Sequence, residues 1–186
     1  VDDLIGHVGK RTDIWLSVSD ERDALLETGG GIRQALPMLE GSAILTANSD
    51  NLWLGADAFA PLLDRWQEEE MDALLLLVRR ENAVAYARQG DFFLGETGHL
   101  ARRGAAESAP FVFTGAQIIA RRAFDGTPAG AFSLNVIWDR EPDIGAFANM
   151  VDDLIGHIVR VDDGMTDTRL RHPVEGMIQQ RAAPHG

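Results

Sequence analysis

Three successive glycines, Gly29–Gly31, most constrain what this chain can fold into. They precede apolar residues at helical spacing, and because they lack side chains a ligand can closely approach their backbone N–H groups. We therefore predict a glycine-rich turn that opens a helix, with Thr28 as the capping residue and Pro37 shortening the far end. Such a turn is typical of sites for a phosphate or a flat base; a loop in which the glycines serve geometry alone is the alternative.

An apolar segment at residues 42–47 follows this helix and ends in Asn48, Ser49 and Asp50. Its partly β-branched composition predicts a strand that is covered on both faces. Open α/β sheets bind ligands just beyond the carboxyl ends of such strands, so we expect Asn48 and Asp50 at a ligand site. A carboxylate there suits Mg²⁺, which prefers hard oxygen donors, whereas an ordinary turn aspartate is the alternative for Asp50.

The remaining pattern predicts further elements of an α/β domain. The longest aliphatic run, residues 73–78, is typical of a central buried strand. A glycine within a predicted strand, at Thr114-Gly115, indicates a bulge or a close backbone approach. The other expected elements are a helix at 58–67 with an apolar stripe of Phe59, Leu62, Leu63 and Trp66, a hairpin that starts at 90–94 and returns at Leu100, a strand at 111–119, and a short structural helix capped by Ser133.

Composition excludes several classes of function. The chain has 29 acidic against 17 basic residues and a net charge of −12, which argues against nucleic acid or an anionic membrane as a partner. It has no cysteine, so disulfides, thiolate nucleophiles and cysteine-based metal centres are excluded. The run at 73–78 is far too short to span a bilayer. We expect a cytoplasmic protein without a membrane anchor.

Several short motifs follow one another along the chain, at Leu25–Leu39, Asn48–Trp53, Met71–Val78, Gly90–Phe92, Phe113–Ile119, Ala131–Asn135 and Trp138–Arg140. In this order they resemble the sugar-phosphate nucleotidyltransferases, and most closely the bacterial group similar to N-acetylmuramate-1-phosphate uridylyltransferase. The likeness implies an α/β fold of the three-layer, Rossmann-like nucleotide-diphospho-sugar transferase (GT-A) type with a mixed sheet. It also implies a core at 1–145 and a divergent, partly loop-like segment at 146–186.

The resemblance also implies an activity and its residues. We expect transfer of a nucleotidyl group from a nucleoside triphosphate to a sugar 1-phosphate, with Mg²⁺ as cofactor. UTP is the expected donor, with uridine against guanosine left open. Asp50 is the implied catalytic residue and holds the metal together with Asp162 or Asp163. The implied ligand contacts are Glu27, Thr28, Gly29, Gly30 and Asn48 on the nucleotide, and Gly90, Asp91, Thr114 and Gly115 on the sugar side.

Both ends of the chain depart from the family's pattern. The family's first strand, its Gly-x-Gly-Thr-Arg-x-Arg-Pro loop for the triphosphate and its Pro-Lys-Pro do not precede Val1, so we expect a sheet without that first strand–loop–helix unit. Residues 168–173 resemble part of the missing loop, which would imply a circular permutation. Residues 161–164 instead match the family's late metal-binding aspartate and keep the family's order. The heptapeptide at 1–7 recurs unchanged at 151–157.

Because these motifs are missing, three hypotheses stay open. The first is an active nucleotidyltransferase. The second is a truncated or non-catalytic relative that binds nucleotide or sugar phosphate weakly or serves as an interaction module. The third is an oligomer in which a partner chain supplies the missing unit.

Overall fold

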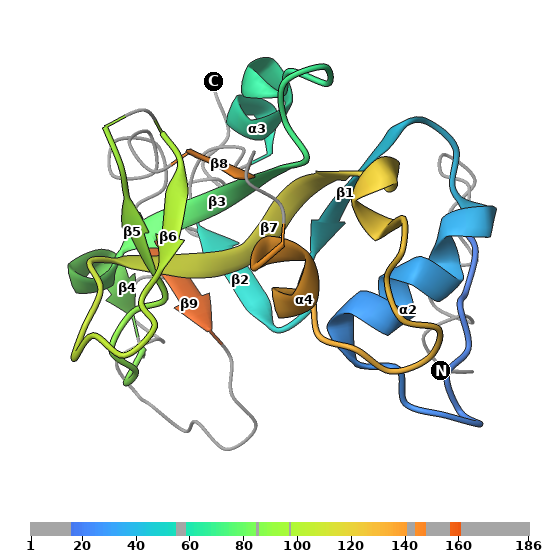
Figure 1. The fold of residues 1–186 in the computed structure, drawn as a ribbon. Coiled ribbons are helices and arrows are strands. Elements are labelled where there is room, and N and C mark those ends of the chain that lie inside the picture. The colour runs from blue at the N-terminus through green and yellow to red at the C-terminus, as the bar shows by residue number, and fades with distance from the viewer. Residues whose placement is uncertain are drawn as a thin grey trace, which may run out of the picture.

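The computed structural model describes residues 16–54, 59–84, 86–96, 98–140, 144–147 and 157–160. They form a mixed α/β fold around an open sheet, which confirms the predicted fold class (Figure 1). The helices are α2 (Glu27–Ala35), α3 (Ala60–Arg65) and α4 (Asn135–Trp138), with 3₁₀ segments at Leu36–Met38, Arg80–Asn82 and Arg121–Phe124. The strands are β1 (Ala43–Ala47), β2 (Asn51–Leu54), β3 (Ala73–Arg79), β4 (Ala83–Val84), β5 (Phe92–Leu94), β6 (Leu100–Arg102), β7 (Phe111–Ala120), β8 (Ile144–Phe147) and β9 (His157–Arg160).

The ten-residue strand β7 organises the main sheet. Strands β1, β3 and β5 pair with it antiparallel, β6 continues the sheet beyond β5, and β8 runs parallel to β3. In Figure 1, β7 crosses the molecule between α2 and β1 on one side and the β5–β6 hairpin on the other. A smaller sheet has the order β2-β9-β4. The segment after β1 and the segment before β5 therefore meet along β7.

The predicted central strand is confirmed in β3, where the six residues before Arg79 are all buried. Its side chains alternate between two apolar clusters, as a strand covered on both faces requires. Leu75 and Leu77 pack in one cluster with Ile137 of α4, and Leu74 and Leu76 belong to the other, which contains Leu62 of α3. Strand β8, which straddles residue 145, is joined to this core through β3.

Helix α3 is shorter than predicted, and one part of its predicted apolar stripe is wrong. Leu62 is fully buried, and Phe59 and Trp66 pack against the same cluster, but Leu63 is 61% exposed. The helix has only six residues. It contacts the sheet along one narrow row, and Leu63 is rotated by about 100° from Leu62 around the helix axis.

The predicted glycine-rich turn before α2 is wrong, because the glycines lie inside the helix. None of them has a positive φ; that conformation belongs to Glu27, with φ 58°. The N–H groups of Gly29 and Gly30 donate to the carbonyl oxygen of Phe132 at 2.9 and 3.1 Å. A Cβ on Gly29 would lie 2.9 Å from that oxygen, and a Cβ on Gly30 would strike the carbonyl oxygen of Gly130. The glycines therefore let the helix pack tightly against residues 130–132.

At the two ends of α2, the predicted cap at Thr28 is wrong and the predicted effect of Pro37 is confirmed. Thr28 does not cap the helix, because its Oγ1 accepts a hydrogen bond from the N–H of Leu134 at 3.1 Å. At the other end, α2 stops at Ala35 and Pro37 lies in the 3₁₀ segment that follows, as predicted. Thr28 thus ties the start of α2 to the segment that leads into α4.

Strand β1 is confirmed in position but is not covered on both faces. Ile44 is buried, whereas Leu45 is 41% exposed. Among the described residues only β7 pairs with β1, so β1 is an edge strand there. Its last residue, Ala47, pairs with Ala116 and brings the following segment to the middle of β7.

Candidate functional site

Two neighbouring pockets contain most of the predicted site residues. The first, called here the α2 pocket, lies between α2 and the segment after β1, and its lining includes Glu27, Thr28, Asn48, Asp50 and Gln117. The second, called here the hairpin pocket, lies beside β5 and β6, and its lining includes Tyr86, Asp91, Arg102, Thr114, Gly115 and Trp138. Asn48 and Phe113 line both pockets.

The structure brings together four of the residues predicted for the nucleotide and metal, namely Glu27, Thr28, Asn48 and Asp50, in the α2 pocket. The other two predicted nucleotide contacts, Gly29 and Gly30, are not in its lining. Their expected contact with a ligand through free N–H groups is corrected, because both groups already donate to the carbonyl of Phe132.

The α2 pocket is acidic. Glu21, Glu27 and Asp50 line it, and no lysine or arginine does so among the described residues. Glu21 accepts a hydrogen bond from the N–H of Leu26 at 3.0 Å. A Cβ on Gly31 would lie 2.5 Å from the Glu21 carboxylate, so this glycine makes room for the acid.

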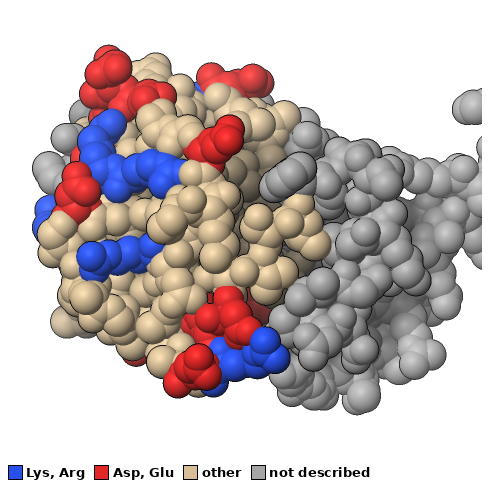
Figure 2. Space-filling model, turned by 90° about the vertical axis from the view of Figure 1, so that its right-hand side faces the viewer, with Lys and Arg blue, Asp and Glu red and all other residues tan. Residues whose placement is uncertain are grey.

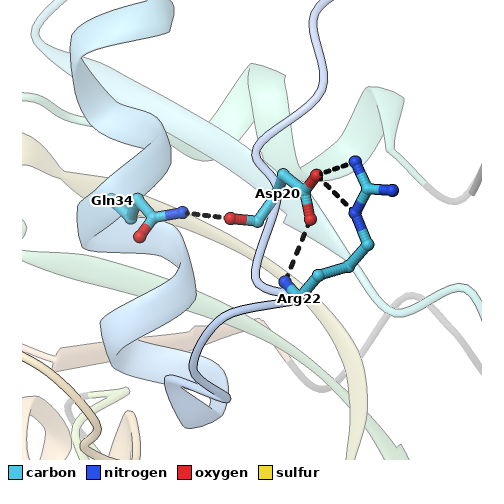
Figure 3. A network of polar contacts seen from close by, with 3 residues as sticks. All are labelled: Asp20, Arg22 and Gln34. Carbon is cyan, nitrogen blue, oxygen red and sulfur yellow. Dashed lines mark hydrogen bonds and ion pairs between the residues drawn. The ribbon is translucent and has the colours of Figure 1, made fainter.

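A polar network holds the segment that carries Glu21 against α2 (Figure 3). Gln34 of α2 donates to the backbone carbonyl of Asp20 at 3.0 Å, and Arg22 pairs with the Asp20 carboxylate at 2.5 Å. The hydrogen bond from Arg22 lowers the pKa of Asp20. On the part of the surface that Figure 2 shows for the described residues, acidic and basic side chains lie interspersed with uncharged ones.

In the hairpin pocket, Asp91 is fixed by its neighbours. Its carboxylate accepts the N–H of Phe113 at 3.1 Å and the hydroxyl of Tyr86 at 3.3 Å. Burial, and then the negative charge of Asp91, raise the pKa of Tyr86. The preceding Gly90 does not line the pocket; its φ of 83° and the close carbonyl of Ala109 give it a structural reason to be glycine.

The predicted irregularity in β7 is confirmed at Thr114-Gly115. Gly115 has φ 83°, and the register with β3 shifts opposite it. Its carbonyl accepts the N–H of Asn48 at 3.0 Å, while the side chain of Asn51 donates to the carbonyl of Thr114. The hydroxyl of Thr114 is itself buried and donates to the carbonyl of Leu76 at 2.9 Å. The backbone at Gly115, rather than the Thr114 hydroxyl, is therefore what this segment presents to the pocket.

Sequence reasoning missed the other wall of the hairpin pocket. Arg102 donates to the side chain of Asn135 at 2.6 Å, and its guanidinium lies 5.2 Å from the ring centroid of Phe92 and 5.6 Å from that of Trp138. Trp138 in turn meets Phe113 edge to face, with centroids 5.0 Å apart. Helix α4 was predicted to be structural only, yet two of its residues line the pocket. No local pattern marks this wall, because it depends on the register between β5 and β6, which pairs Phe92 with Arg102.

The predicted metal ligands are only partly placed. Asp50 lines the α2 pocket, whereas Asp162 and Asp163 lie outside the described residues. Among the described residues, no group of three or more histidine, cysteine, aspartate or glutamate side chains is arranged to hold a metal ion. The carboxylate of Asp50 and the amide oxygen of Asn48 are nevertheless the hard donors that Mg²⁺ prefers.

No helix in the described part of the chain is long and apolar enough to cross a bilayer. The tail residues 161–164 and 168–173, and both copies of the repeated heptapeptide apart from His157, also lie outside the described residues.

Comparison with known proteins gives curated relatives and a set of similar structures. No family model matches the chain. Over 125 residues the chain is 35% identical to N-acetylmuramate alpha-1-phosphate uridylyltransferase from Caulobacter vibrioides. The aligned residues make up 66% of this chain and 52% of that protein. The chain therefore spans about half the length of this relative.

Two solved structures extend the comparison. The inositol-1-phosphate CTP transferase from T. maritima has a TM-score of 0.68 at 12% identity, over 98% of this chain and 73% of its own. HddC from Yersinia pseudotuberculosis complexed with GMP-PN has a TM-score of 0.62 at 16% identity, over 94% of this chain and 74% of its own. At these identities the likeness establishes a shared fold.

Proposed function

We propose that this chain transfers a nucleotidyl group from a nucleoside triphosphate to a sugar 1-phosphate, because it is 35% identical over 125 residues to a curated uridylyltransferase and shares its fold with an inositol-1-phosphate CTP transferase and with a protein solved with GMP-PN. We propose UTP as the donor and Mg²⁺ as the cofactor, because the curated relative is named a uridylyltransferase and Asp50 offers a hard oxygen ligand.

The single observation that carries the proposal is that the α2 pocket and the hairpin pocket adjoin and share Asn48 and Phe113. Nucleotidyl transfer between two substrates needs two binding compartments that open onto one point, since the attacking oxygen and the α-phosphorus must be held in line. Asn48 lies at that point, because its N–H is bonded to Gly115 at the bulge of β7.

The two pockets differ in the charge of the side chains that line them, and this difference suits different parts of the two substrates. Arg88 and Arg102 line the hairpin pocket, where they offer donors to the phosphate of a sugar 1-phosphate. Glu21 and Glu27 in the α2 pocket are acceptors for ribose hydroxyls and base N–H groups. A nucleoside in the α2 pocket thus places its phosphates toward Asn48 and Asp50.

The chemistry requires positioning rather than a nucleophile from the protein. A phosphate oxygen of the sugar 1-phosphate attacks the α-phosphorus of the triphosphate, a new P–O bond forms, and the bond to pyrophosphate breaks. Mg²⁺, when bound, supplies neutralisation of the phosphate charge, and Asp50 is the described residue that would hold it. In this arrangement Arg102 donates to the phosphate of the sugar 1-phosphate, Asp91 can accept a hydrogen bond from a sugar hydroxyl, and Asn48 lies between the two substrates.

Pyrophosphate release tests the proposal. The full chain with UTP, MgCl₂ and a panel of sugar 1-phosphates that includes N-acetylmuramate 1-phosphate is expected to release pyrophosphate. We expect Asp50→Asn to abolish release, because the amide keeps the shape of the side chain and removes its charge. Asp64→Asn is the matched control, since Asp64 lies exposed on α3, outside both pockets.

Two results would contradict different parts of this proposal. Binding of nucleotide without pyrophosphate release at high protein concentration would support the non-catalytic relative. Equal release by the Asp50→Asn variant and the unaltered chain would refute the role of Asp50.

A further inference from the structure

Gln117 is a buried polar residue that the proposed chemistry does not use. It lies in the second half of β7, paired with Thr46 of β1 and Leu75 of β3, and its side chain is only 1% exposed. The surrounding strand residues Ile118 and Ile119 are apolar and buried. A polar side chain in such a place is costly unless its donors and acceptors are used.

One half of the Gln117 carboxamide is fixed by α4. The indole N–H of Trp138 donates to Oε1 of Gln117 at 3.1 Å. An indole N–H only donates, so the group that faces it must be the carbonyl oxygen. The orientation of the carboxamide is therefore set, and its NH₂ group points away from Trp138.

Gln117 also lines the α2 pocket, together with Thr28 and Asn48. Its NH₂ group donates no hydrogen bond to any residue in the described part of the chain. A donor that is held in place and left without an acceptor is suited to bind an acceptor on a ligand.

The partner of this hydrogen bond faces the second compartment. Trp138 lines the hairpin pocket, where its ring packs against Phe113 and the guanidinium of Arg102. The Gln117–Trp138 hydrogen bond thus spans the partition between the two pockets. The orientation of the Gln117 carboxamide therefore depends on the hydrogen bond from Trp138.

We propose that Gln117 is a specificity-determining residue of the α2 pocket, whose NH₂ group donates to a carbonyl oxygen of a nucleobase and is oriented by Trp138 acting as a positioning residue. The inference rests on the proposed function, because it requires a nucleotide in the α2 pocket. It selects bases that carry a carbonyl oxygen, such as uracil and guanine, over adenine, which has none.

Binding of nucleoside monophosphates to the full chain tests this without requiring turnover. The probes are UMP, GMP and AMP, and the readout is the dissociation constant from calorimetry. Gln117→Glu keeps the shape and the oxygen that faces Trp138 but replaces the donor with an acceptor. We expect UMP or GMP, whichever binds the unaltered chain, to bind this variant at least about 10-fold more weakly near neutral pH. Affinity should recover as the pH falls, because a protonated carboxyl group is again a donor.

Trp138→Phe is the second variant, and it keeps an aromatic ring against Phe113 while removing the indole donor. Because the carboxamide is no longer oriented, we expect the ratio of the dissociation constant for AMP to that for UMP or GMP to fall measurably, by up to about 10-fold. Circular dichroism should show that the fold is intact. Unchanged affinity and base preference in both variants would overturn the inference and leave the proposed function standing. Failure of all three probes to bind the unaltered chain would overturn both.

Discussion

Replacement of Gly115 by alanine should destabilise the protein by more than the strain of a positive φ alone, because Asn48 and Asn51 lie close to this glycine. Gly115 has φ 83°, where a residue with a Cβ costs roughly 1–2 kcal/mol more than glycine. Its Cβ would also lie 2.5 Å from Nδ2 of Asn51 and 2.8 Å from Cγ of Asn48. Carbon atoms in ordinary contact are about 3.5–4 Å apart, so both asparagines must move by about 1 Å.

The expected cost follows from these two effects. Displacement of Asn51 breaks its hydrogen bond to the carbonyl of Thr114, worth about 0.5–1.5 kcal/mol. Together with the roughly 1–2 kcal/mol cost of the positive φ, this should lower the free energy of unfolding of Gly115→Ala by about 1.5–3.5 kcal/mol. Gly98→Ala is the matched control, because Gly98 has φ 86° and its Cβ would meet nothing within 4 Å. That variant should lose only about 1–2 kcal/mol.

Urea unfolding of the two variants measures the difference, and nucleotide binding reports on the pocket. Gly115→Ala should be less stable than Gly98→Ala by about 0.5–1.5 kcal/mol and should bind UMP more weakly, while Gly98→Ala binds normally. Equal losses of stability in the two variants, with equal UMP affinity, would refute the close approach of Asn48 and Asn51 to Gly115.

Two further predictions concern α2 and the hairpin pocket. Gly30→Ala should lower the free energy of unfolding by about 1–3 kcal/mol, because its Cβ would strike the backbone carbonyl of Gly130. Gly31→Ala is the matched control, because its Cβ would meet only the flexible side chain of Glu21. Its free energy of unfolding should stay within about 1 kcal/mol of that of the unaltered protein, and thermal unfolding measures both variants. The raised pKa of Tyr86 means that the unfolded state loses this proton at lower pH than the folded state, so its contribution to stability is complete below pH 10.0 and is lost as the pH rises through the folded pKa. Tyr86→Phe should flatten the decline in the free energy of unfolding above that pH, and an unchanged slope would contradict the assignment.

The elements that could be predicted before the structure are those whose pattern lies in neighbouring residues. The aliphatic run of β3 fixes a central strand because only a fully buried strand is apolar on both faces. The glycine at 115 marks the bulge because few other residues adopt its positive φ. Asp50 follows β1 directly in the chain, so the rule that ligands bind beyond the carboxyl end of a strand predicts it at a ligand site. The structure places Asp50 in one pocket with Glu27 and Thr28.

The role of the glycines in α2 and the second wall of the hairpin pocket became visible only in the folded protein. Residue 30 has to be glycine because the carbonyl of Gly130, about 100 residues away in sequence, leaves no room for a Cβ. Arg102 and Trp138 meet only because β6 and α4 both pack beside β5. Burial and periodicity are written in neighbouring residues, whereas strand register and helix packing depend on partners that are distant in the chain. The sequence could therefore place the acidic half of the site but not the arginine, the indole or the buried Gln117 that face it.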